Sequence, residues 1–275
     1  EDMRAGFGSQ DRLHESELVD VLRRTQGTRV DIAEAGSSIL RTYDPDDRRL
    51  FINAALPSES RQFLLAHHLM KVAADDVIAR IVAQAAIPAV GADRLLAVGL
   101  ANYAAGALMM PYGRFRESAR ELRHDIDQLA RRFGVSFEQA CHRLSTLQRP
   151  GLRGIPFFFC RMDMAGNITK RHSATRLQFA RFGGACPLWV VHEAVAIPDR
   201  ILTQLGETPD GVRYVSMAKG LVKPSGSYAR ASRRYAVALG CEIEHAANFI
   251  YADGLQLHDE AAAAPIGVTC RLCPR

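Results

Sequence analysis

The chain has 275 residues, of which 48% are hydrophobic and 24% are charged, an ordinary composition for a folded globular protein. This length suggests about two domains and a proper core, which excludes a disordered chain and a disulfide-stapled miniprotein. No stretch approaches the roughly 20 uncharged apolar residues of a membrane span, and Glu1-Asp2-Met3-Arg4 does not begin a signal peptide. We therefore expect a cytoplasmic protein, and we interpret its abrupt ends as those of a fragment.

The charge is distributed unevenly along the chain. Residues 1–150 hold equal numbers of basic and acidic side chains, so residues 151–275 carry the whole formal net charge of +5. Nearly all the basic residues are arginines, which suit bidentate phosphate binding. A GC-rich genome would also produce this arginine content, so composition alone does not choose between the two explanations.

The first half of the chain predicts helices with one short pair of strands. Two strands are expected within residues 38–53, around the turn Asp44-Pro45-Asp46-Asp47. Helices are expected at residues 16–26, from the cap signal at 57–60 to about 108 with breaks at Pro88 and Gly91, and twice within 115–148, where the two join near 134–136.

The pattern changes near Pro150-Gly151. Residues 157–171 predict a hairpin, residues 212–218 and 235–239 predict further strands, and a helix is expected around 199–205. We therefore predict an α+β fold: a mainly helical domain over residues 1–150, then a domain over residues 151–275 with an antiparallel sheet and helices.

The segment Arg61–Lys71 resembles the active-site helix of the ImmA/IrrE metallopeptidase-like family. That family's motif places two histidines at i and i+4, which bind zinc, beside a glutamate that acts as general base. Here His67 matches the first ligand, but His68 replaces the glutamate and Lys71 replaces the second ligand. The resemblance implies a degenerate peptidase-like domain without peptidase activity, so we do not expect this chain to be an enzyme.

The segment Leu129–Leu144 has the pattern of a helix-turn-helix, with Gly134 in the turn and Ser136 as a cap. The same phrase also closes the ImmA/IrrE-like domain, where it is a structural hairpin. No base-reading face is evident, which favours the structural interpretation.

Four cysteines are candidate metal ligands. Cys270 and Cys273 form a C-x₂-C pair, Cys186 precedes a proline, and Cys241 follows a strand and a glycine. In a reducing compartment, clustered cysteines indicate a metal, a cluster or catalysis more often than disulfides. One pair and two single cysteines favour a [4Fe–4S] cluster, although tetrahedral zinc remains an alternative. Cys141 and Cys160 are expected to be buried apolar residues.

Three long phrases show a second resemblance, and with the peptidase-like part they cover almost the whole chain. They lie at residues 156–171, 179–189 and 266–273. They resemble the short-chain fatty acyl-CoA regulator family, whose mycobacterial members control propionate catabolism. The resemblance implies a transcription regulator that senses acyl-CoA and carries a [4Fe–4S] cluster. It also implies an N-terminal helix-turn-helix domain, absent from this chain, that binds DNA.

An acyl-CoA ligand needs cationic donors for its phosphates and apolar walls for its adenine and acyl groups. The predicted cationic contacts are Lys170, Arg171, Arg176, Arg181 and Lys219. The predicted aromatic walls are Phe157, Phe158, Phe159 and Tyr214. Solvated strand ends and an ordinary core are the alternatives for these two sets.

We expect the ligand to shift the population of two domain arrangements, in a protein that forms homo-oligomers. The alternatives are a zinc-stabilised interaction module and an enzyme, either a residual metallopeptidase or an acyl-CoA hydrolase. No Ser-His-Asp or Cys-His arrangement stands out in support of the enzyme.

Overall fold

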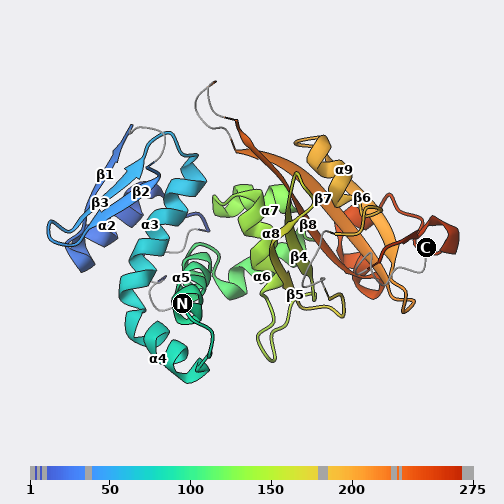
Figure 1. The fold of residues 1–275 in the computed structure, drawn as a ribbon, viewed down its shortest axis with the longest axis horizontal. Coiled ribbons are helices and arrows are strands. Elements are labelled where there is room, and N and C mark those ends of the chain that lie inside the picture. Colours follow the sequence, from blue (N-terminus) through green and yellow to red (C-terminus); the bar gives the residue numbers. More distant parts are fainter. Residues whose placement is uncertain are drawn as a thin grey trace. The chain divides into compact units, whose positions relative to one another are not determined.

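The computed structural model describes residues 4, 7, 11–34, 39–178, 185–223, 228 and 231–267 (Figure 1). The chain divides into two compact units. The first comprises Glu1–Phe115 and Ala130–Ser136, and the second comprises Arg116–Leu129 and Phe137–Arg275. Both contain helices and sheet, so the predicted α+β class is confirmed.

The first unit contains a three-stranded sheet with strand order β1-β3-β2. Strand β3 (Arg49–Asn53) pairs in parallel with β1 (Arg29–Ala33) and antiparallel with β2 (Arg41–Asp44). The pair β2–β3 confirms the two strands predicted around Asp44-Pro45, whereas β1 was not predicted. Leu50 and Ile52 alternate along β3 and are fully buried, which places the core on one face of this sheet.

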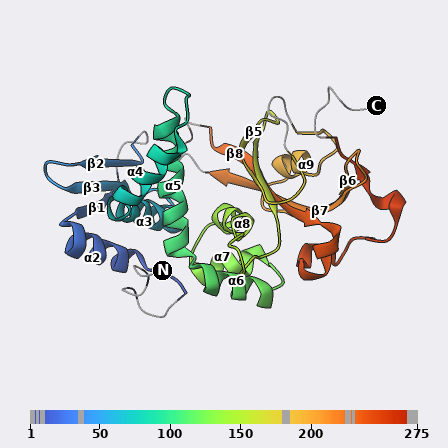
Figure 2. The ribbon, with the colours of Figure 1, turned by 90° about the horizontal axis from the view of Figure 1, so that it is seen from below.

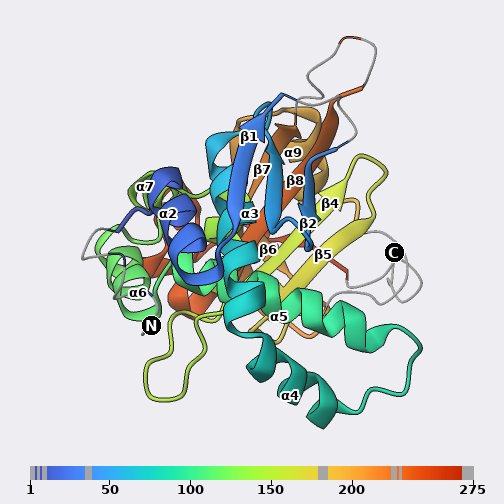
Figure 3. The same cartoon turned by 90° about the vertical axis from the view of Figure 1, so that its left-hand side faces the viewer.

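Four helices complete the described part of the first unit. They are α2 (Glu15–Gln26), α3 (Ser58–Ala73), α4 (Asp75–Ala85) and α5 (Ala92–Met109). Helix α3 packs against both α2 and α5. Figure 3 shows α4 and α5 as an antiparallel pair, joined across the predicted break at Pro88 and Gly91. Among the described residues no single helix is long and apolar enough to cross a bilayer. Helix α5 and the following helix α6 (Tyr112–Glu121) meet the length and hydropathy criteria only as a bent pair.

Three helices, rather than the two predicted, precede the large sheet. They are α6 (Tyr112–Glu121), α7 (Ile126–Phe133) and α8 (Phe137–Ser145). Helix α8 packs on three strands of that sheet, β4 (Phe158–Asp163), β5 (Ile168–Ser173) and β8 (Arg233–Glu242). Its residues Phe137, Ala140 and Leu144 are buried. The second compact unit takes in Arg116–Leu129 and then the chain from Phe137 onward, and the predicted domain boundary near residue 150 stays a prediction. The packing of α8 agrees with a structural hairpin rather than a DNA-reading helix.

The large sheet has six strands in the order β5-β4-β8-β7-β6-β9. Strands β4 (Phe158–Asp163), β5 (Ile168–Ser173), β7 (Arg213–Lys223) and β8 (Arg233–Glu242) confirm the predicted strands. Strand β6 (Ile201–Glu207) occupies the segment predicted as a helix, and the helix instead is α9 (Val191–Ala196). The antiparallel pairing of β6 with β7 over seven residue pairs outweighs the weak local helical preference. The short β9 (Ala264–Pro265) is parallel to β6.

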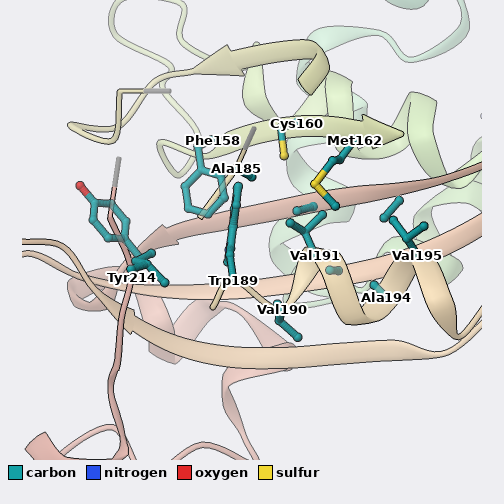
Figure 4. Packing of buried hydrophobic residues seen from close by; sticks show 14 of the residues in the cluster. Phe158, Cys160, Met162, Ala185, Trp189, Val190, Val191, Ala194, Val195 and Tyr214 are labelled. Carbon is teal, nitrogen blue, oxygen red and sulfur yellow. The ribbon is translucent and has the colours of Figure 1, made fainter. Parts of the chain in front are cut away.

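The two faces of this sheet are covered by different helices. A buried cluster that includes Phe158, Trp189 and Tyr214 fills the space between the sheet and α9 (Figure 4). Helix α8 lies on the opposite face (Figure 2). Three short 3-10 helices follow β8: η1 (Ile243–Asn248), η2 (Ile250–Ala252) and η3 (Glu260–Ala262).

Candidate functional site

Three cations from three different strands lie in one row across the large sheet. Arg161 of β4 is in register with Lys170 of β5 and with Val237 of β8, and Val237 is in register with Lys219 of β7. Paired residues on neighbouring strands point to the same face of a sheet. We call Arg161, Lys170 and Lys219 the cation row; it lies on the face that carries α8.

Two acidic residues from the preceding helices contact the cation row. Glu138 of α8 lies 3.1 Å from Arg161 Nη1 and 3.9 Å from Lys170 Nζ. Asp127 of α7 accepts a hydrogen bond of 3.1 Å from Lys219 Nζ. Three cations thus share two carboxylates. The row therefore keeps a positive surplus that an anionic ligand can neutralise.

Aromatic rings lie close to the ammonium groups on this face of the sheet. Lys219 Nζ lies 4.7 Å from the centre of the Phe137 ring, and Lys170 Nζ lies 5.6 Å from that of Phe159. A fourth cation, Lys223, lies 5.5 Å from the centre of the Tyr235 ring. Such cation–π contacts hold an ammonium group in place while its hydrogens stay available as donors.

Burial governs ionisation around the row. Burial lowers the pKa of Lys170, and nearby Glu138 partly offsets this effect. Burial, with the charge of Lys170 and the neighbouring His172, lowers the pKa of His142 to about 3. Burial also lowers the pKa of His172. These imidazoles are therefore neutral at pH 7 and leave the positive charge to the lysines and the arginine.

The other predicted cations lie elsewhere. Arg171 is in register with Cys160, which belongs to the core on the α9 face, so Arg171 points away from the cation row. Arg176 donates to the Glu242 carboxylate from Nε at 3.1 Å and Nη2 at 2.6 Å. That contact raises the pKa of Arg176 and engages its guanidinium with a carboxylate of the protein, although the Arg176 side chain is exposed. Arg181 lies outside the described residues.

The predicted aromatic walls are core residues in this structure. Phe157, Phe158 and Phe159 are 0% exposed and Tyr214 is 1% exposed. The Phe158 ring on β4 contacts Trp189 (Figure 4), and the ring of Phe157, directly before β4, contacts Phe249. Packing accounts for all four rings without a ligand, and their part in a binding site stays a prediction.

The described cysteines point to different sides of the sheet. Gly240 faces the Phe158 ring on the α9 side, so strand alternation directs the next residue, Cys241, to the α8 side. Ala185, directly before Cys186, packs in the cluster on the α9 side. Cys270 and Cys273 lie outside the described residues. Within the described ranges no group of three or more His, Cys, Asp or Glu side chains is arranged to hold a metal ion.

The chain approaches its C-terminal cysteines from the α9 side. Ile266 belongs to the same buried cluster as Ala185 and Trp189, and its side chain fills the space above Gly206. Cys270 is four residues further on, a distance of at most about 14 Å of extended chain. The end of the described chain and Cys186 are therefore on one side of the sheet, and Cys241 is on the other.

In the first unit, an arginine contacts both histidines of the degenerate peptidase motif. Arg41 Nη1 donates to His67 Nδ1 at 3.0 Å, and Nη2 lies 3.5 Å from His68 Nδ1. Burial and the charges of Arg41 and Lys71 lower the pKa of each histidine to about 4. A cation already contacts both imidazoles, and the other residue on this side is an ammonium. These side chains do not form a zinc site.

Sequence reasoning missed Arg161 and both acids of the row. Arg161 follows Phe159 and Cys160 in an apolar strand, and nothing in the local pattern shows which residues lie across from it. The alternation of β4 would have placed Arg161 on the same face as Phe159. Only the strand register shows that Lys170 and Lys219 lie in one row with Arg161.

Comparison with known proteins places the chain among bacterial regulators. Residues 146–275 match the model of the short-chain fatty acyl coenzyme A regulator C-terminal family, and residues 26–145 match the IrrE N-terminal-like domain. A solved structure of a Mycobacterium tuberculosis transcriptional regulator is 43% identical, with a TM-score of 0.90 over 98% of this chain and 81% of that one. The chain belongs to the short-chain fatty acyl-CoA regulator family.

Curated members of this family are similar over most of this chain. The propionyl-CoA carboxylase regulator of Cereibacter sphaeroides is 48% identical over 90% of this chain and 52% of its own length. The HTH-type transcriptional regulator PrpR of Mycobacterium tuberculosis is 47% identical over 86% of this chain and 48% of its own length. The HTH-type transcriptional regulator RamB of the same species is 38% identical over 97% of this chain and 58% of its own length. The chain spans about half the length of these relatives.

Proposed function

We propose that this chain is the ligand-sensing region of a transcriptional regulator of short-chain fatty-acid catabolism, and that its effector is a short-chain acyl-CoA such as propionyl-CoA. The names of its relatives as regulators support the regulatory role. The observation that carries the ligand class is the cation row, which gathers Lys170, Arg161 and Lys219 on one face of the second unit.

In this proposal the cation row binds the phosphates of the CoA moiety. Arg161 already donates from Nε to Thr169 and from Nη1 to Glu138, so its remaining N–H groups would donate to phosphate oxygens. The flanking ammonium groups would act as point charges. Glu138 and Asp127 hold these groups in position before the ligand arrives, which reduces the entropy lost on binding. A ligand with several phosphate charges has more to gain from this row than a free short-chain acid.

Calorimetric titration tests the ligand and its position. Propionyl-CoA should release heat on binding, and free propionate should not. Replacing both lysines of the row, Lys170→Met with Lys219→Met, should weaken binding by about tenfold or more for each lost charged hydrogen bond. The matched control is Lys71→Met in the first unit, which should bind like the unsubstituted chain.

Two outcomes of this titration would count against the proposal. The absence of heat with every acyl-CoA tested would remove the ligand class. If the double lysine variant bound propionyl-CoA with unchanged affinity, the ligand class would stand, but the phosphates would have to bind away from the cation row.

A [4Fe–4S] cluster is the second part of the proposal, and the cysteines differ in how well they fit one. Cys186, Cys270 and Cys273 follow or precede segments packed on the α9 side, so the chain can bring them together. Cys241 is fully buried on the other face, and burial raises the pKa of its thiol to about 12. We propose Cys186, Cys270 and Cys273 as ligands, with the fourth position taken by another donor. The bound cluster would supply a structural or redox-sensitive centre.

Metal analysis of protein purified without oxygen tests the cluster. We expect a brown protein that contains iron and sulfide; Cys186→Ser should lose both, and Cys241→Ser should retain them. A colourless protein with one zinc ion would favour the zinc-stabilised module instead. Loss of iron from Cys241→Ser, with the fold retained, would restore Cys241 to the ligand set.

DNA binding would be made by the part of the longer protein that lies outside this chain. Acyl-CoA can change that binding only if it has a higher affinity for one conformation of the protein than for another. The proposal therefore requires reciprocal linkage: operator DNA must change the acyl-CoA affinity of the complete regulator by the same factor.

A further inference from the structure

Two cations of the first unit lie beside the degenerate peptidase motif and have no acidic partner among the described residues. Arg41 of β2 is partly buried, and Lys71 is an exposed residue in the last turn of α3. Burial lowers the pKa of Arg41, and no described carboxylate offsets that effect. Arg41 and Lys71 therefore leave positive charge at this place that no acid of the described chain neutralises.

The charges that act on the two histidines of the motif are also positive. Burial lowers the pKa of His67 and of His68 to about 4, and the charges of Arg41 and Lys71 add to this effect. No carboxylate of the described chain opposes it. Partly buried charge is costly unless a counter-charge neutralises it, so this cluster favours an anion.

The contacts of Arg41 determine which nitrogen of each histidine carries the hydrogen. A guanidinium has no acceptor atom. His67 Nδ1, 3.0 Å from Nη1, therefore accepts, and His68 Nδ1 lies 3.5 Å from Nη2 of the same group. Each neutral imidazole then carries its hydrogen on Nε2. His68 is 2% exposed, and its Nε2 has no hydrogen-bond partner among the described residues. The cluster thus holds more donors than acceptors.

Helix geometry brings two of these donors toward one point. His67 and Lys71 are four residues apart on α3, so they are neighbours on one face of the helix. In the metallopeptidase motif, the side chains at these two positions converge on one metal ion. Here they are an imidazole and an ammonium group, and Arg41 adds a guanidinium beside the imidazole. The position that suits a metal in a peptidase is therefore surrounded by hydrogen-bond donors.

We propose that Arg41, His67 and Lys71 bind a phosphate group at this position. A phosphate monoester carries a charge of about −1.5 to −2 at pH 7, which matches two cations better than the single charge of a carboxylate. Its terminal oxygens are strong acceptors for guanidinium, imidazole and ammonium donors. The ligand is inorganic phosphate or a small phosphate monoester, since both present the same group.

A phosphate group can reach these side chains from solvent, because Lys71 is exposed and Arg41 and His67 are partly exposed. The site belongs to the first unit and does not depend on the cation row. A phosphate group alone is a small ligand, so we expect a dissociation constant on the order of 1 mM. The site therefore stays largely empty in a titration with micromolar propionyl-CoA, for which Lys71→Met remains a valid control.

NMR titration of the 275-residue chain tests this site, because the imidazole signals of His67 and His68 report on it locally. Inorganic phosphate should shift these signals to saturation, and acetate at equal ionic strength should not. Glycerol phosphate is the second probe and distinguishes the two sources. Binding about tenfold tighter than that of inorganic phosphate would identify a monoester as the ligand, and equal or weaker binding would identify free phosphate.

Substitutions separate the charge of this site from charge in general. Lys71→Met should weaken phosphate binding by about tenfold, because it removes one charged hydrogen bond, and Lys71→Arg should retain most of the affinity. The matched control is Arg80→Met. Arg80 is exposed on α4 and is not among the charges that act on either histidine. This control should bind phosphate like the unsubstituted chain, as should Lys170→Met with Lys219→Met.

Arg41→Gln is an independent measurement, with circular dichroism as a check of its fold. It should weaken phosphate binding at least as much as Lys71→Met, because glutamine keeps a donor for the histidines but removes the charge. The absence of a saturable shift with both phosphate probes would overturn the proposal. So would an equal response to acetate, or unchanged phosphate affinity in Lys71→Met.

Discussion

At the scale of single residues, the two histidines of the first unit show how a metal-binding motif is lost without loss of the fold. His67 and His68 keep their places on α3, but Arg41 from β2 donates to one and lies beside the other. The positive charge and the burial both disfavour protonation of the imidazoles. Neutral histidines in this place accept hydrogen bonds, so they contribute to the packing of β2 against α3.

The pH dependence of stability follows from these two residues. Their pKa is about 4 in the folded chain and near 6.5 when unfolded, so the unfolded state binds more protons between those values. The contribution of these two histidines to the free energy of unfolding should therefore be complete above pH 6.5 and should decrease as the pH is lowered toward 4. Urea unfolding monitored by circular dichroism at a series of pH values measures this loss.

The double variant His67→Gln with His68→Gln is the control for that series. It should lose less stability between pH 6.5 and 4 than the unsubstituted chain, although His124, His142 and His172 leave part of the dependence, since burial lowers the pKa of each. An equally steep fall in the double variant would show that the pair is not responsible.

At the scale of elements, close packing of α9 on β7 depends on a glycine. A Cβ at Gly220 would lie 2.0 Å from the backbone oxygen of Ala194, so Gly220→Ala must push α9 away from the sheet. We expect a loss of about 1–3 kcal/mol in the free energy of unfolding. Gly113→Ala in α6, where a Cβ meets nothing within 4 Å, should instead be neutral or stabilise by up to about 1 kcal/mol. Denaturant unfolding of both variants measures the difference.

Local sequence patterns predicted most elements of this fold. Alternating or purely apolar runs identified β3, β4, β7 and β8, and the cap signal before Ser58 identified the start of α3. Residues 199–205 were wrongly expected to be helical, because Ile201 and Leu205 have a spacing that also suits a helix. The strand there is determined by its antiparallel partner β7, which a single local window does not contain.

The candidate site was predictable only in part for the same reason. Lys170 and Lys219 were expected as ligand contacts at strand ends, and the structure does place them in one row. Their connection through Arg161 and Val237 depends on the register of four strands. The direction of Cys241 likewise depends on which face of β8 meets Phe158, and composition and motif spacing carry no information on that.

At the scale of the whole molecule, the chain divides into two compact units, and two units can unfold in more than one transition. Propionyl-CoA should stabilise the second unit selectively, because the cation row lies there. A ligand at 100 times its dissociation constant adds about 2.7 kcal/mol to the stability of the unit that binds it. Hydrogen exchange with and without ligand should show increased protection in β4, β5, β7 and β8.

The charge-reversed variant Lys170→Glu with Lys219→Glu supplies the comparison for this measurement. Its exchange pattern should be the same with and without propionyl-CoA. Protection that instead rises throughout α2–α5 would move the ligand to the first unit.

The pairing of β9 with β6 has a consequence for how this protein avoids aggregation. Strand β6 would otherwise end the large sheet with unpaired amide and carbonyl groups, a template on which another chain can add a strand. Two residues of β9 cover part of it, Pro265 offers no amide hydrogen to extend the sheet, and Ile266 donates to the Glu207 carbonyl at 2.8 Å. The same short segment leads directly to the last two cysteines. If this segment came away from β6, the uncovered strand edge would be open to pairing with another chain.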